Sequence, residues 1–257
     1  IISHLSLNNM SLMKGEAVSH LKELLELYNL PKSKENQIRY RTKISEKILK
    51  IIPLINELES LKEAIQVALD DPRFVGVGEI GLDYFVEGLD PHKQEYFFDA
   101  QLDLAQKYQL PVVLHVRRSQ DAILKALRLR NIPSGIAHAF NGSFQQAENF
   151  MKLNFVMGFG GAMTHDRALQ IRRLAKDLPL ESIVLETDAP DIPPMWLSHA
   201  EHPRNEPGEL PQISSVLADI RSDLISCTQH LCAQNALRVI PRWNQLIQNC
   251  SKVTQPH

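Results

Sequence analysis

The sequence lacks the features that mark a membrane protein, a secreted protein or a nucleic-acid-coating protein. None of its apolar runs approaches the ~18–20 residues that a membrane-spanning helix needs. The first ten residues, IISHLSLNNM, contain no basic segment followed by a sustained apolar one and do not predict a secretory leader. The formal net charge of −2 excludes a broadly basic surface. We expect a cytoplasmic protein that has no membrane partner and no evident protein partner.

Cysteine is also scarce. The chain has three cysteines, Cys227, Cys232 and Cys250, and their spacing fits no zinc-ligand pattern. Because the number is odd and small, we expect free thiols in a reducing compartment rather than a disulfide framework. The 257 residues, 44% of them hydrophobic, are enough to bury one large core.

From about Phe74 onward, short apolar runs alternate with helix-like stretches. The runs expected as strands are Phe74–Ile80, Pro111–Val116, Gly135–Phe140, Phe155–Gly160 and Ile183–Thr187. The expected helices between and after them are His92–Tyr108, Ser119–Leu129, Ser143–Leu153, His165–Leu178, Glu209–Arg221 and Leu224–Arg238. This alternation predicts an α/β fold with parallel strands and crossover helices.

Residues 1–70 have a different pattern. Two stretches, Ala17–Leu30 and Lys43–Leu69, have helical periodicity, and no segment there predicts a strand. We therefore divide the chain into an atypical, mostly helical segment, residues 1–70, and a barrel-like region, residues 71–257.

Four of the expected strands end in, or are closely followed by, a residue type that binds metal ions. These residues are Glu79, His115, His138 and Asp188. In a parallel barrel or sheet the carboxyl ends of the strands meet at one rim, so the four side chains are expected to lie together. Their oxygen and nitrogen donors suit Zn²⁺, Mn²⁺ or Mg²⁺. A divalent ion there would activate water and neutralise an anionic substrate.

Each of these residues has a simpler interpretation when it is taken alone. A strand histidine such as His115 or His138 is often a hydrogen-bonded core residue. Asp188 would serve as a helix N-cap or loop carboxylate, and Glu79 as the ion-pair partner of Arg117. The occurrence of a ligand-type residue at the carboxyl ends of four different strands favours the metal site.

Three other residues have ligand-like chemistry. Glu186 shares a face with Asp188 one layer deeper, so we expect it to support the ligands. His199 and His202 have ligand-like spacing, but they lie in a charged, proline-rich loop and are expected at the surface.

At these residues the sequence resembles the TatD family of metal-dependent deoxyribonucleases, a branch of the amidohydrolase-like TIM barrels. The matching segments are Val77–Phe85, Gln94–Arg117, Gly135–Ser143, Leu185–Pro190 and Arg204–Pro207. The resemblance implies a distorted (β/α)₈ barrel that cleaves phosphodiester bonds in DNA with two divalent ions at the carboxyl rim. Glu79 would bridge the two ions, and His115 and His138 would complete the second ion site. Asp188 would bind the first ion and act as the catalytic residue that helps to activate water.

The sequence departs from the family pattern near its N-terminus. The His-x-His pair of the family's first strand is missing, since His4 and His20 are isolated. The first ion site therefore keeps only Glu79 and Asp188, and we expect one ion per chain. We expect a TIM-barrel-like fold that is distorted and incomplete at its N-terminal strands, through truncation, a frameshift, replacement or divergence.

The predicted function is metal-dependent hydrolysis of phosphodiester bonds in DNA, with Arg117 or Arg204 contacting a substrate phosphate. Two alternatives stay open. The same rim would suit an amidohydrolase that acts on a small amide or ester. The missing His-x-His favours a catalytically impaired remnant with one metal site.

Overall fold

The computed structural model describes residues 58–197 and 204–253 of the chain. The chain divides into two compact units, Ile1–Asp71 and Pro72–His257. In the first unit the described part contains helix α3 (Leu58–Ala68), which lies within the predicted helix Lys43–Leu69. The other predicted helix, Ala17–Leu30, lies outside the described residues, as do His4, His20, His199 and His202.

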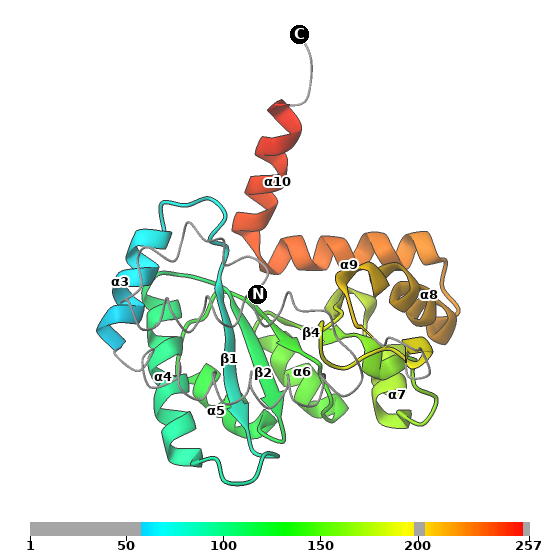
Figure 1. Ribbon diagram of the computed structural model, residues 1–257, viewed down its shortest axis with the longest axis horizontal. Helices are drawn as coiled ribbons and strands as arrows, with labels where there is room; N and C mark the ends of the chain where they lie inside the picture. The colour runs from blue at the N-terminus through cyan, green and yellow to red at the C-terminus, as the bar shows by residue number, and fades with distance from the viewer. Residues whose placement is uncertain (1–57, 198–203, 254–257) are drawn as a thin grey trace. The chain divides into compact units, whose positions relative to one another are not determined.

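The second unit is built on a parallel β-sheet, which has five strands within the described residues (Figure 1). They are β1 (Val77–Asp83), β2 (Val112–Arg117), β3 (Gly135–His138), β4 (Phe155–Phe159) and β5 (Ile183–Leu185). Each strand pairs in parallel with the next one in the chain. The predicted α/β class with parallel strands is confirmed.

Helices connect the strands and cover one face of the sheet. They are α4 (Pro91–Lys107), α5 (Gln120–Arg128), α6 (Phe144–Lys152) and α7 (Leu169–Asp177), with 3₁₀ turns η3 (Gly161–Thr164) and η4 (Leu180–Ser182). Asp90 caps α4 by accepting from the backbone N–H groups of His92 and Lys93. Ser143 and Gln146 form a capping box at the start of α6. Helices α4, α5 and α6 contact β1, β2 and β4, respectively, and share with them a large buried core.

The chain after β5 is helical. It contains η5 (Met195–Leu197), η6 (Pro207–Glu209), α8 (Leu210–Arg221), α9 (Ile225–Val239) and α10 (Pro241–Val253). The sequence predicted α8 and α9 but not α10. No helix in the described ranges is both long and apolar enough to cross a membrane.

The predicted first strand was placed too early. It was expected over Phe74–Ile80, but β1 begins at Val77 and continues to Asp83. The strand continues through Gly81 because this residue lets the two backbones approach closely. A Cβ atom at Gly81 would lie only 2.0 Å from the His115 carbonyl oxygen.

The second face of the sheet has a smaller apolar layer. It contains Ile136, Val156 and Val184, which pack with Val239 and Ile240 at the end of α9. Because side chains alternate along a strand, the residues two positions beyond this layer point to the same face. The polar residues of the site follow there, at the carboxyl ends of the strands.

Candidate metal centre

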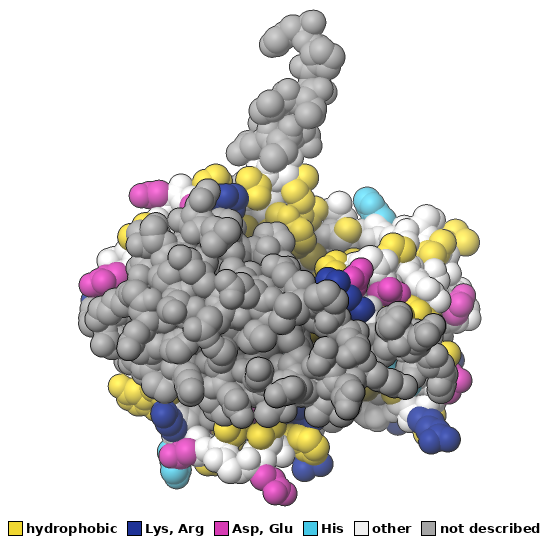
Figure 2. All heavy atoms as spheres, viewed as in Figure 1, with side chains coloured by type: hydrophobic (Ala, Val, Ile, Leu, Met, Phe, Trp, Pro, Cys, Tyr) yellow, Lys and Arg dark blue, Asp and Glu magenta, His cyan; other side chains and the backbone are white. Residues whose placement is uncertain are grey.

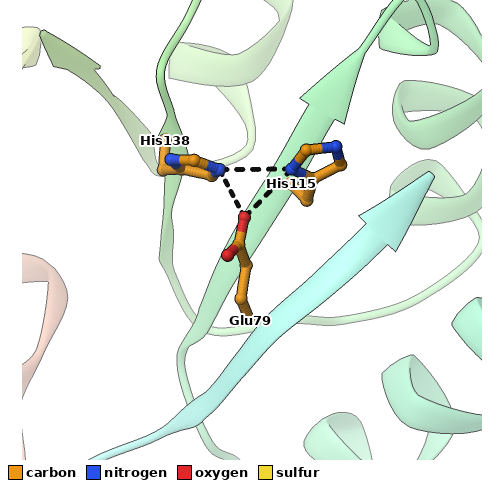
Figure 3. Close-up of side chains that lie close together, drawn as sticks. All are labelled: Glu79, His115 and His138. Atoms are coloured by element: carbon orange, nitrogen blue, oxygen red, sulfur yellow. Dashed lines mark hydrogen bonds and ion pairs between the residues drawn. The ribbon is translucent and has the colours of Figure 1, made fainter. Parts of the chain in front are cut away.

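Three of the four predicted ligands meet at the carboxyl rim of the sheet. Glu79 lies on β1, His115 lies on β2, and His138 is the last residue of β3. His115 and His138 are directly opposite each other in the strand register. Figure 3 shows the Glu79 carboxylate directed at a ring nitrogen of each histidine. One donor atom from each residue lies within 4.8 Å of the other two.

The three donor atoms face one common point. Glu79 Oε1 lies 3.1 Å from His115 Nδ1 and forms a close ion pair with His138 Nε2. His115 Nδ1 and His138 Nε2 are 3.3 Å apart. One carboxylate oxygen and two imidazole nitrogens at this spacing fit a divalent ion of the zinc or manganese type.

Irregular backbone geometry lies next to two of these side chains, Glu79 and His138. The pairing of β1 with β2 is irregular between Val77 and Ile80, which sets the direction of Glu79. Ala139, directly after His138, has a φ of 45° and donates its N–H to Glu186 Oε1 at 2.5 Å. Such left-handed non-glycine residues are concentrated at functional sites.

Asp188 and Glu186 lie on the other side of His138. Asp188 Oδ1 is 3.7 Å from His138 Nδ1, and Glu186 Oε1 is 3.9 Å from the same nitrogen. Gly158 makes room for Glu186, since a Cβ atom there would lie 2.1 Å from Glu186 Oε2. His138 therefore has Glu79 at its Nε2 side and two carboxylates at its Nδ1 side.

The charges of the site are strongly coupled. Burial would raise the pKa of Glu79, but hydrogen bonds from both histidines outweigh burial and lower it to about 2. Burial would lower the pKa of His138, but Glu79 and the other carboxylates raise it to about 9. The hydrogen bond to Glu79 likewise raises the pKa of His115. In the ion-free centre the His138 imidazole therefore favours its positively charged form, at the place where a divalent ion would add its own charge.

Burial outweighs the other effects on the pKa of the two remaining carboxyl groups, unlike at Glu79. It raises the pKa of Glu186 to about 7, and it also raises the pKa of Asp188. Both groups therefore hold protons at higher pH than exposed carboxyl groups do.

Sequence reasoning missed Asp83, whose carboxylate contacts the ring nitrogen of His115 that does not face Glu79. Asp83 Oδ2 lies 3.1 Å from His115 Nε2, and Asp83 Oδ1 accepts the N–H groups of Phe85 and Val86 at 2.8 and 3.0 Å. Burial acts to raise the pKa of Asp83, but these hydrogen bonds lower it, so the carboxylate stays ionised. With a divalent ion bound, Asp83 would accept the proton on Nε2 and so leave the Nδ1 lone pair to the ion. The signal was its position, four residues after Glu79 at the end of the same strand.

Asn205, which sequence reasoning also missed, fixes the loop that carries Asp188. Its side-chain nitrogen donates to the carbonyl oxygens of Thr187 and Asp191 at 2.6 and 2.5 Å. Asn205 is buried, so these bonds are shielded from water. They hold the chain on both sides of Asp188.

The two arginines predicted to contact substrate differ in their surroundings. Arg117 is exposed, and its guanidinium carbon lies 4.1 Å from the centre of the Phe85 ring. Within the described ranges Arg117 forms no ion pair, so the alternative pairing with Glu79 is not seen. Arg204 Nε pairs with Glu206 Oε1 at 2.6 Å. Charged side chains of both signs are scattered over the visible described surface (Figure 2).

Known proteins resemble this chain over most of its length. A family model described as TatD related DNase matches residues 33–241. The uncharacterized metal-dependent hydrolase YjjV of Escherichia coli (strain K12) is 40% identical over 65% of this chain and 62% of its own length. The 3'-5' ssDNA/RNA exonuclease TatD of Klebsiella pneumoniae (strain 342) is 36% identical over 70% of this chain and 69% of its own.

A solved structure gives the same result for the fold. The crystal structure of YjjV, described as a TatD homolog from Escherichia coli K12, superposes with a TM-score of 0.66 at 36% identity. The match covers 72% of this chain and 70% of that one. The chain thus spans 62% of the YjjV sequence in the sequence comparison. The family model's match, residues 33–241, includes the rim where the three donors meet.

Proposed function

Because this chain belongs to the TatD family of DNases, we propose that it hydrolyses phosphodiester bonds in DNA with a divalent ion held by Glu79, His115 and His138. The observation that carries this proposal is the meeting of three donor atoms, from three successive strands, within 4.8 Å of one another. Family membership selects the phosphodiester over other substrates of such a rim.

The chain's own residues have distinct roles in this proposal. When bound, the ion supplies Lewis-acid catalysis and a positive charge for the reacting phosphate. Asp188, next to His138, accepts the proton of the attacking water. Burial raises the pKa of Asp188 and so makes its carboxylate a stronger base.

Arg117 is the better candidate of the two arginines for binding a substrate phosphate. It is exposed, and within the described residues no carboxylate pairs with it. A phosphate at Arg204 would have to compete with Glu206, which lies 2.6 Å away. The Klebsiella relative is named for single-stranded DNA and RNA, and we propose single-stranded DNA as the substrate here.

One observation favours a weaker enzyme as the second candidate. The sequence has no His-x-His pair, so the first ion site would have only Glu79 and Asp188 as ligands. Two carboxylates alone bind a Zn²⁺-type ion weakly. This candidate keeps the same centre and substrate but has a low rate.

We also propose a cytoplasmic location and two structural units. The exposed Cys227 and the buried Cys232 are free thiols, which fits a reducing compartment. The boundary between Asp71 and Pro72 supports the division near residue 70. Closure of a complete barrel would require strands from residues outside the described ranges.

A substrate panel tests the proposed function. The chain, loaded with Mn²⁺ or Zn²⁺, is given end-labelled single-stranded DNA, the matching duplex, an activated ester and a small amide. We expect ion-dependent cleavage of the single strand and little action on the ester or the amide. Turnover of the amide or the ester with intact DNA would contradict the proposal and favour an amidohydrolase.

A further inference from the structure

Two arginine side chains lie against an exposed aromatic ring next to the metal centre. The Phe85 side chain, in the turn after β1, is 45% exposed. The guanidinium carbons of Arg117 and Arg118 lie 4.1 and 4.6 Å from its ring centre, within the range of a cation–π contact. Arg118 has a φ of 55°, a conformation that non-glycine residues rarely adopt and that is concentrated at functional sites.

Within the described residues, neither of these arginines is in an ion pair. Other arginines pair with carboxylates, among them Arg130, Arg172, Arg173, Arg204 and Arg221. A ring restrains a guanidinium group without neutralising it. The two arginines are therefore ordered before an anion binds, which lowers the entropy cost of binding.

The arginine pair is tied to the metal centre through the backbone and through Asp83. Arg117 follows His115 by two residues on β2, so the two share a face and their Cα atoms are about 7 Å apart. The Asp83 carboxylate accepts the N–H of Phe85 and also contacts His115 Nε2. The backbone at Phe85 is thus linked through Asp83 to the ligand His115.

We propose that Phe85, Arg117 and Arg118 form a binding site for a nucleotide of a single-stranded nucleic acid, next to the bond that is cut. The guanidinium groups bind its phosphates, and the ring and the guanidinium planes stack on its base. In a duplex the bases are stacked on one another, so this site favours a single strand. The site deepens the proposed function and rests on it for the choice of ligand.

Equilibrium binding of a labelled oligothymidylate, followed by fluorescence anisotropy in EDTA, tests the site apart from catalysis. Phe85→Leu keeps an apolar side chain but removes the ring, and it should weaken binding about fivefold or more. Arg117→Gln and Arg118→Gln should each reduce the slope of log K against log salt concentration by about 0.7. Arg118→Lys keeps the charge, so it should keep the slope and lose only part of the affinity.

Arg173→Gln is the matched control. The Arg173 guanidinium also lies over a ring, 5.3 Å from the centre of Phe144, but it pairs with Asp177 at 3.9 Å and belongs to α7. This variant should bind as the wild type does, and thermal melts should show that all variants are folded.

The proposed site would be overturned if the folded Phe85, Arg117 and Arg118 variants bound the oligonucleotide with the affinity and the salt slope of the wild type. It would also be overturned if the wild-type chain itself did not bind the oligonucleotide. If the variants lose binding while the metal-loaded wild type cleaves nothing, the site stands and the proposed activity fails.

Discussion

Replacing Asp83 with asparagine should damage the metal centre without touching any of its three donor atoms. In the wild type, Asp83 Oδ1 accepts two backbone N–H groups and Oδ2 faces His115 Nε2. In Asp83→Asn, the single amide oxygen stays with the two N–H groups, because an NH₂ there would leave both donors unpaired. The amide NH₂ then faces His115 Nε2, which must become an acceptor.

The consequence is a change of tautomer. If Nε2 accepts, the ring proton moves to Nδ1, the atom that lies 3.1 Å from Glu79 Oε1 and faces the ion position. A protonated Nδ1 cannot bind a metal. Loss of an outer partner of a ligating histidine typically lowers metal affinity about 10- to 100-fold, or about 1.4–2.7 kcal/mol. We expect Asp83→Asn to fall in this range.

Two measurements check this prediction. Competition with a chelator gives the affinity for Zn²⁺ or Mn²⁺, and ¹⁵N chemical shifts of the imidazole give the tautomer in the ion-free protein at a pH where the ring is neutral. Asp103→Asn is the control, since Asp103 pairs with Arg130 and is exposed. Wild-type affinity together with a proton still on Nε2 in Asp83→Asn would refute the reasoning.

The other predictions concern the same rim and the thiols. Asp188→Asn should remove nearly all nuclease activity, because an amide cannot accept the proton of the attacking water. Elemental analysis and a thermal melt should show that this variant keeps the ion and the fold. A near-normal rate would contradict the role of Asp188 as the base. Elemental analysis of dialysed protein should find one ion per chain, and two tightly held ions would mean that ligands were overlooked. Metal affinity should rise with pH toward 9, because an ion must displace the proton of His138, whose pKa is raised to about 9; a flat profile would contradict this coupling. In a Cys250→Ser background, the exposed Cys227 should react with iodoacetamide well before Cys232, because Cys232 is buried and burial raises its pKa to about 11.

The sequence predicted the strands well because both faces of this sheet are covered. Buried parallel strands are continuous apolar runs, and four of the five runs here end in, or are closely followed by, a polar residue expected at the rim. The same reasoning brought Glu79, His115 and His138 together before any contact was known. It placed β1 three residues too early, because nothing in the local pattern shows that Gly81 must pack on the His115 backbone.

The missed residues depend on contacts between distant segments. The expected strand ended at Ile80, before Asp83, and the contact of Asp83 with His115, 32 residues later, depends on the register of β1 and β2. Asn205 reaches the carbonyl oxygen of Thr187 across a proline-rich loop. Helix α10 was not predicted, although Pro241 stands at its first position, where proline is favoured.

The most direct test of the metal centre is the rate of single-stranded DNA cleavage as a function of Mn²⁺ concentration, compared between the wild type and Glu79→Gln. Glu79 Oε1 is the donor atom next to both histidines, so its loss should abolish ion binding at physiological concentrations. We predict a rate that rises and saturates with Mn²⁺ in the wild type and stays near zero in the folded variant. Cleavage by Glu79→Gln with the wild-type dependence on Mn²⁺ would show that the ion acts elsewhere and would contradict the centre assigned to this rim.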